Sequence, residues 1–143
     1  MNLSRRDACI VLPAMLLSLH ARAQEQKTPL PSKIYNFDEL SPHQSGSLTS
    51  RGILNGKLFE GCQIAIHESE LAPHSIPHPP HQHRHEEMVL VTEGTLEFTI
   101  NGIATRAGAG SILFAGSNEQ HGIRNPEPTP AKYFVLALGP ENQ

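Results

Sequence analysis

Residues 78–94 have the sequence His78-Pro-Pro-His-Gln-His-Arg-His-Glu-Glu-Met-Val-Leu-Val-Thr-Glu-Gly94, and the interpretation of the whole chain starts from this stretch. Four of the nine histidines lie here within eight positions, directly ahead of two glutamates. Imidazole and carboxylate groups at this density are typical ligands of a divalent transition metal. An apolar run over residues 88–91 follows, so at least part of the stretch belongs to an ordered core. We therefore expect the first half of a metal site, with a further ligand from much later in the chain.

The spacing of these residues suggests which of them share a face. If the segment is a strand, His81 and His83 point to the same side, because side-chain direction repeats every second residue. Glu87 has the same parity, but His85 has it too. A bend between residues 84 and 86 would favour Glu87, whereas a straight strand admits His85 equally, so both choices stay open on geometry alone.

The remainder of the chain predicts an all-β fold. Short apolar or alternating segments recur with turn residues between them, and no segment keeps a helical period over three turns. Asn101-Gly102 is a strong signal for a type I′ hairpin turn. The expected strands cover residues 61–71, 88–91, 96–100, 103–106, 111–115, 121–124 and 132–138. This number of short strands indicates a β-sandwich or a small barrel.

The first 23 residues have the composition of an export signal. Arg5 and Arg6 precede an apolar run over residues 8–19, and Ala21-Arg22-Ala23 fits a signal-peptidase cleavage pattern. The apolar run is too short to span a bilayer, so we expect no membrane anchor after its removal. Ser4-Arg5-Arg6 resembles the twin-arginine motif, and an ordinary secretory signal is the alternative. We expect three parts: a signal peptide over 1–23, an N-terminal arm over 24–50 and a barrel over 51–143.

Charge and cysteine content restrict the function further. The chain has a formal net charge of −3, and removal of Asp7, Arg5, Arg6 and Arg22 with the signal makes it −5. Nucleic acid is therefore not an expected partner. Cys62 alone remains in the mature chain, so no internal disulfide can form. We expect a bacterial protein exported to the periplasm or secreted outside the cell.

Two segments resemble the conserved motifs of the cupin superfamily. His81-x-His83-x3-Glu87-x6-Gly94 is similar to the first motif, and Gly110-x5-Gly116-x-Asn118-x2-His121-x3-Asn125 to the second. Ser75, Gly116 and Asn118 depart from the usual residues at turn positions, and none of the three is a ligand position. The resemblance covers about residues 60–138 and implies a small cupin barrel, a double-stranded β-helix or jelly roll. It further implies that the barrel holds one metal ion through His81, His83, Glu87 and His121.

The resemblance implies a metal-dependent function but does not specify the substrate. Three imidazoles and one carboxylate suit Mn or Fe, which we favour, as well as Zn, Ni, Co or Cu. They leave two positions of an octahedral shell for a small-molecule ligand or substrate. We expect a metal-dependent, dioxygenase-like enzyme acting on a small oxygen-bearing molecule. A redox-neutral isomerase or lyase, or a non-enzymatic small-molecule or metal-binding protein, is the alternative.

Residues around the metal shell are harder to assign. The pattern places four other histidines at the rim of the pocket or in a supporting role: His67, His74, His78 and His85. No general base can be named from the sequence. Six apolar residues are expected to line the pocket: Val89, Val91, Phe98, Ile112, Phe114 and Phe134. Small cupins usually pair through a barrel sheet, so the resemblance also implies a homodimer, which would explain why strand 88–91 is apolar on both faces.

Overall fold

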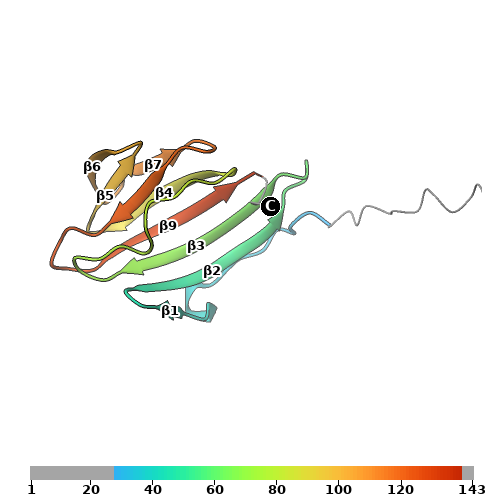
Figure 1. The fold of residues 1–143 in the computed structure, drawn as a ribbon. Coiled ribbons are helices and arrows are strands. Elements are labelled where there is room, and N and C mark those ends of the chain that lie inside the picture. The colour runs from blue at the N-terminus through green and yellow to red at the C-terminus, as the bar shows by residue number, and fades with distance from the viewer. Residues whose placement is uncertain (1–27, 140–143) are drawn as a thin grey trace, which may run out of the picture.

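A computed structural model of the chain describes residues 28–139, which form two antiparallel β-sheets. The larger sheet has six strands in the order β1-β2-β3-β9-β4-β7, and the smaller has three in the order β6-β5-β8. Figure 1 shows long, curved strands β2, β3 and β9 in the larger sheet, with β5, β6 and β7 gathered at one end of the molecule. The all-β fold expected from the sequence is confirmed.

The strands follow the apolar segments of the sequence closely. Asn101 and Gly102 have φ values of 48° and 85°, so the hairpin between β5 and β6 has the two left-handed residues of a type I′ turn. The strands have the following bounds: β1 His43–Ser45, β2 Leu48–Lys57, β3 Gln63–Leu71, β4 Glu86–Glu93, β5 Thr95–Ile100, β6 Ile103–Gly108, β7 Ile112–Ala115, β8 His121–Arg124 and β9 Ala131–Leu138. A short 3-10 helix, η1, spans Phe37–Glu39.

Strand register decides which side chains enter the barrel. Val89 of β4 lies opposite Val135 of β9, and both are buried, so odd-numbered residues of these strands face the interior. The interior is tightly filled at one end by fully buried side chains. These include Leu71, Val91, Leu96 and Tyr133. Burial of this apolar core is the main source of the fold's stability.

Small residues leave the other end of the interior less filled. Ala137 of β9 lies opposite Ala65 of β3 on one side and Glu87 of β4 on the other. Ala65, Ala137 and Glu87 are only half-buried, although all three point inward. This end of the barrel is therefore open to solvent, and it is the end that carries the histidine-rich segment.

Three of the residues expected to line the pocket lie on the outer face of the larger sheet. Ile112 and Phe114 of β7 are 64% and 57% exposed, and Phe134 of β9 lies opposite Leu90, on the outer side of β4. The expectation was wrong for these three because strand parity, which the sequence pattern left open, turns them outward. Val89, Val91 and Phe98 do face inward, but they are buried in the core. A homodimer that pairs through a barrel sheet needs an apolar outer face of this kind. The homodimer itself stays a prediction.

The segment ahead of residue 51 belongs partly to the sheet. Residues 43–50, expected in an arm, form β1 and the start of β2. Residues before them lie along the sheet: the Leu30 N–H donates to the Lys57 carbonyl at 2.8 Å, and the Leu30 side chain covers Gly56. The expected signal peptide over residues 1–23 lies outside the described residues. Among residues 28–139, no helix is long and apolar enough to cross a membrane.

Asn125 ties the end of β8 to two other parts of the barrel. Its side chain is fully buried, and its Nδ2 donates to the carbonyls of Leu71, Ala72 and Thr129 at 2.8–3.1 Å. Its Oδ1 accepts a hydrogen bond from the Glu127 N–H at 3.0 Å. Asn125 is thus a structural group, as expected from the sequence, and all its bonding capacity in this environment is used.

We predict that Asn125→Ala lowers the free energy of unfolding by about 2–4 kcal/mol, since it leaves several buried backbone groups without a partner. Urea unfolding followed by circular dichroism measures the change. Asn36→Ala is the matched control, because the Asn36 amide bonds only to the exposed Glu39 carboxylate. Equal unfolding midpoints for the two variants would contradict the role of Asn125.

Candidate metal centre

His81 and His83, the first two predicted ligands, lie ahead of β4 on an irregular segment. Only His81 makes a ladder contact, an isolated antiparallel bridge to His121 at the start of β8. Its N–H donates to the His121 carbonyl at 2.9 Å, and the His121 N–H donates back to the His81 carbonyl at 2.8 Å. The assumption that His81 and His83 share one face of a regular strand was therefore wrong. Their convergence depends on the path of the loop and on this bridge.

The chain bends at residues 84 and 85, directly before β4 begins. This is the bend required for Glu87 to face the same side as His83. Glu87 lies opposite Ala115 of β7 and Ala137 of β9, so small side chains flank it on both neighbouring strands. The short neighbours leave the Glu87 carboxylate accessible to the rings of His83 and His121.

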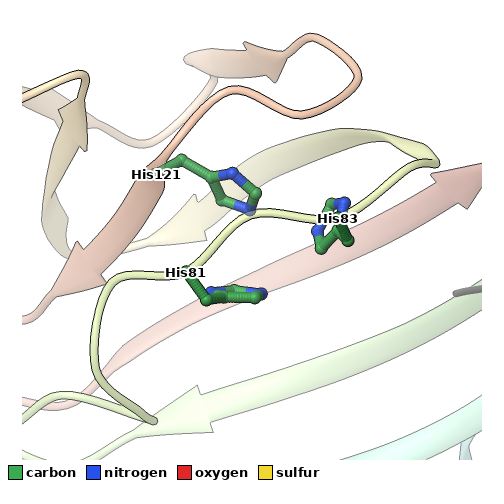
Figure 2. Close-up of side chains that lie close together, drawn as sticks. All are labelled: His81, His83 and His121. Carbon is green, nitrogen blue, oxygen red and sulfur yellow. The ribbon is translucent and has the colours of Figure 1, made fainter.

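The three predicted histidine ligands lie close together (Figure 2). The ring centroid of His121 is 4.7 Å from that of His81 and 4.6 Å from that of His83, and the His81 and His83 centroids are 5.1 Å apart. His83 and His121 are buried, and His81 is half-buried. Figure 2 shows rings from the loop before β4 and from β8 entering one common space. Residues far apart in the sequence thus supply one cluster.

Backbone carbonyls fix the tautomers of two rings. His83 Nδ1 lies 2.9 Å from the His85 carbonyl oxygen, and His121 Nδ1 lies 2.9 Å from the Glu119 carbonyl oxygen. A carbonyl only accepts, so each Nδ1 carries the hydrogen, and each Nε2 presents a lone pair when the ring is neutral. Within the described part of the chain, both Nε2 atoms, and Nδ1 of His81, are buried without a hydrogen-bond partner. Such orphaned atoms are costly unless something binds them.

Glu87 supplies the negative charge of the cluster. Its Oε2 lies 3.4 Å from His83 Nε2, and its Oε1 lies 3.6 Å from His121 Nε2. Both distances exceed those of a good hydrogen bond. Burial lowers the pKa of His81, and the neighbouring His78, His121 and His83 lower it further, whereas Glu87 raises it in part. His81 is therefore held in the neutral, metal-binding form at neutral pH.

The donor nitrogens of the three histidines fit a single metal ion. Ligand nitrogens of His81, His83 and His121 all lie within 4.8 Å of one another. Donors around one transition-metal ion are separated by up to about 4.4 Å, since each bond is about 2.0–2.2 Å long. Small side-chain movements therefore suffice to bring them to bonding distance. The cluster is able to hold a metal ion.

His85 belongs to a second possible group of donors, with His83 and Glu87. Its ring stacks on that of His83, with centroids 3.5 Å apart and an angle of 14° between the planes. An imidazole binds a metal in the plane of its ring, so two parallel stacked rings cannot both bind one ion well. This geometry favours Glu87 over His85 as the partner of His83 and gives His85 a packing role beside it.

The other expected rim histidines lie in different places. His78 meets His81 edge-on, with ring centroids 4.4 Å apart, and its Nδ1 lies 3.1 Å from the Pro79 carbonyl oxygen. His74 is exposed, as expected. His67 on β3 instead lies opposite Val135 and points into the barrel. The sequence did not reveal this orientation, because apolar residues of both parities surround His67 in β3.

Hydrogen bonds hold the loop of the second motif in shape, although Gly116 and Asn118 differ from the usual residues of that motif. Asn118 has a φ of 61°, a left-handed conformation that asparagine tolerates better than most residues other than glycine. Its N–H donates to the His83 carbonyl at 2.7 Å, and the Gly116 N–H donates to Glu119 Oε2 at 3.1 Å. The loop of the second motif therefore holds the backbone of the first motif in place.

The fold and the cluster together define a class: a small antiparallel β-barrel with a histidine and glutamate site at its open end. The profile of the Cupin domain family matches residues 67–137. These residues therefore belong to the cupin superfamily, and the barrel is a cupin barrel.

Similar solved structures agree with this fold. An RmlC-like cupin from Shewanella frigidimarina is 18% identical, with 76% of this chain and 93% of that chain covered and a TM-score of 0.64. A predicted oxalate decarboxylase from Thermotoga maritima is 18% identical, with 76% and 100% covered and a TM-score of 0.65. The polyketide cyclase RemF from Streptomyces resistomycificus is 18% identical, with 79% and 83% covered and a TM-score of 0.67. No curated protein matches the sequence significantly.

We predict that His83→Ala and His121→Ala each abolish stoichiometric metal binding, whereas His85→Ala retains it. Each of the first two variants removes a buried nitrogen that faces the common space, and His85→Ala removes only a stacked ring. Elemental analysis after loading and dialysis measures the metal content. Full occupancy in His121→Ala would show that the second motif supplies no ligand, and loss in His85→Ala would favour the alternative donor group.

Proposed function

We propose that this cupin is a metal-dependent enzyme of the dioxygenase-like kind, acting on a small oxygen-bearing molecule. The observation that carries the proposal is the set of orphaned ring nitrogens of His81, His83 and His121, which converge beside Glu87 at the open end of the barrel. Three nitrogens and one carboxylate leave part of the shell of a six-coordinate ion free for a substrate. A divalent ion held there would supply Lewis-acid or redox activation of the bound oxygen atoms.

Each residue of the cluster has a distinct task in this proposal. The carbonyls of His85 and Glu119 orient the rings of His83 and His121 through their Nδ1 hydrogens, so both lone pairs stay directed at the site. Glu87 offsets part of the positive charge of a bound ion. Ala65 and Ala137 leave room for a small molecule beside the cluster. The buried core at the other end of the barrel closes the site to water from that side.

A purely metal-storing protein is the less favoured alternative. That role needs side chains to fill the free positions of the ion, and His85 and His78 are the nearest candidates. His85 lies parallel to His83, and His78 Nδ1 lies beside the Pro79 carbonyl. The stacked His85 ring cannot share an ion with His83, and Nδ1 of His78 is already occupied by a carbonyl.

We also propose that the protein is exported and loaded with Mn or Fe before export. The twin-arginine-like start of the sequence supports this, because that route carries folded proteins. The prediction is that Arg5→Lys with Arg6→Lys keeps the full-length precursor in the cytoplasm, whereas Lys27→Arg, outside the signal, has no effect. Cell fractionation and immunoblotting of the bacterial host measure this. Normal export of the double variant would favour the general secretory route.

For the activity, we predict O2 consumption by the Fe or Mn form with at least one member of a panel of catechols, diketones and flavonols. His83→Ala, treated identically, should consume none, because it loses the ion. An oxygen electrode with product analysis measures this. Substrate conversion without O2 uptake would instead show a redox-neutral isomerase or lyase. If fully loaded protein neither converts any member of the panel nor consumes O2, the protein is not an enzyme for these substrates.

A further inference from the structure

The wall of the barrel facing the cluster carries one further imidazole, that of His67. In the β3–β9 ladder His67 lies opposite Val135, and in the β9–β4 ladder Val135 lies opposite Val89. Residues directly opposite one another in antiparallel strands point to the same face. Val89 is fully buried and Val135 is 6% exposed, so both lie in the core. The His67 side chain is therefore directed into the interior.

The position of His67 places it beside the cluster. Two strand spacings, roughly 10 Å in total, separate β3 from β4. Glu87 lies two residues before Val89 on β4, in the row formed with Ala137 and Ala65. His67 and Glu87 therefore lie in neighbouring rows on the same inner face, with Val135 and the short Ala137 of β9 between them. The carboxylate of Glu87 is close enough to act on the pKa of the His67 ring, so a small molecule held beside Glu87 would lie within reach of that ring.

Among residues 28–139, no hydrogen bond or ion pair engages either ring nitrogen of His67, and the side chain stays half-buried. Other ionisable groups near it are committed. Glu68 points to the opposite face and forms an ion pair with Arg51 at 3.1 Å. Burial raises the pKa of the Tyr133 hydroxyl to about 12, so this group keeps its proton. Of these three groups on β3 and β9, His67 is the one left as a proton acceptor.

The electrostatic surroundings of His67 suit a proton acceptor. Burial lowers the pKa of His67, whereas the carboxylates of Glu87 and Glu68 act in the opposite direction. The ring is therefore neutral at neutral pH, and one nitrogen can accept a proton. After it does, the two carboxylates stabilise the imidazolium. The charged groups that act on it are Glu87 from β4 and Glu68 from β3, and Tyr133 lies on the neighbouring strand β9.

We propose that His67 is the general base of this site, taking the proton of a substrate hydroxyl as its oxygen binds at the cluster. The O–H bond breaks, its electron pair stays on the oxygen, and the proton forms a new N–H bond on the ring. No oxidant or reductant is needed for this step. The proposal rests on the proposed function and narrows its substrate class to molecules with two adjacent oxygen atoms, at least one of them a hydroxyl that is protonated in solution.

The test uses protein loaded with Zn(II), which does not oxidise the probes, and compares two ligands. 4-Nitrocatechol must lose a proton to chelate an ion, and its visible absorbance reports that loss. Oxalate is already fully ionised at neutral pH. We expect His67→Gln and His67→Asn to keep full zinc occupancy and an unchanged melting temperature. They should bind 4-nitrocatechol about tenfold more weakly at pH 6, with the difference closing as the pH rises and the free probe ionises.

Oxalate affinity should stay unchanged in both variants, because no proton has to be removed. His43→Gln, on the exposed strand β1, is the matched control and should behave like the wild type with both ligands. Unchanged binding of 4-nitrocatechol, loss of zinc, or an equal loss of both ligands in the His67 variants would each overturn the role of His67 as a base. Failure of zinc-loaded wild type to bind either ligand would overturn the proposed function itself, and His67 as its base with it.

Discussion

The pair of backbone hydrogen bonds between His81 and His121 is the constraint on which the site depends. These bonds, of 2.9 and 2.8 Å, fasten the loop before β4 to the first residue of β8. They bring into contact two residues that are 40 positions apart, one on the loop that leads into β4 of the larger sheet and the other on β8 of the smaller sheet. Because Asn118 also donates to the His83 carbonyl, the loop of the second motif holds the first at two points. These contacts help to set the path of the irregular segment 81–85.

This anchoring has an energetic consequence. The barrel buries three imidazole nitrogens without giving them a protein hydrogen-bond partner, and each such atom costs about 1–3 kcal/mol. Burial of core residues such as Leu71, Val91 and Tyr133, which pack at the closed end, offsets this cost. Stability and site chemistry are thus divided between the two ends of one small barrel. Strained or unsatisfied groups gathered at one place are typical of a functional site.

Much of this could be predicted from the sequence. The alternating and apolar segments gave the strands from β3 onward within a few residues, and Asn101-Gly102 marked its hairpin, because both signals are local. The histidine spacing and the later His121 matched the cupin motifs, and the structure brings those residues together. Strand pairing is not local, so the sequence pattern could not show that β1 and the start of β2 extend the sheet to residue 43.

The sequence by itself determined which ligand types are present, where they stand along the chain and that the fold is all-β. Only the tertiary structure decided to which side of its strand each side chain points. It turned Ile112, Phe114 and Phe134 outward and His67 inward, because the side of a strand is set by its partners in the ladder and not by its own composition. It also separated Glu87 from His85, two residues of equal parity, through the bend at residues 84 and 85 and the stacking of His85 on His83. Ring orientation arises from contacts across the barrel, and no local pattern contains that information.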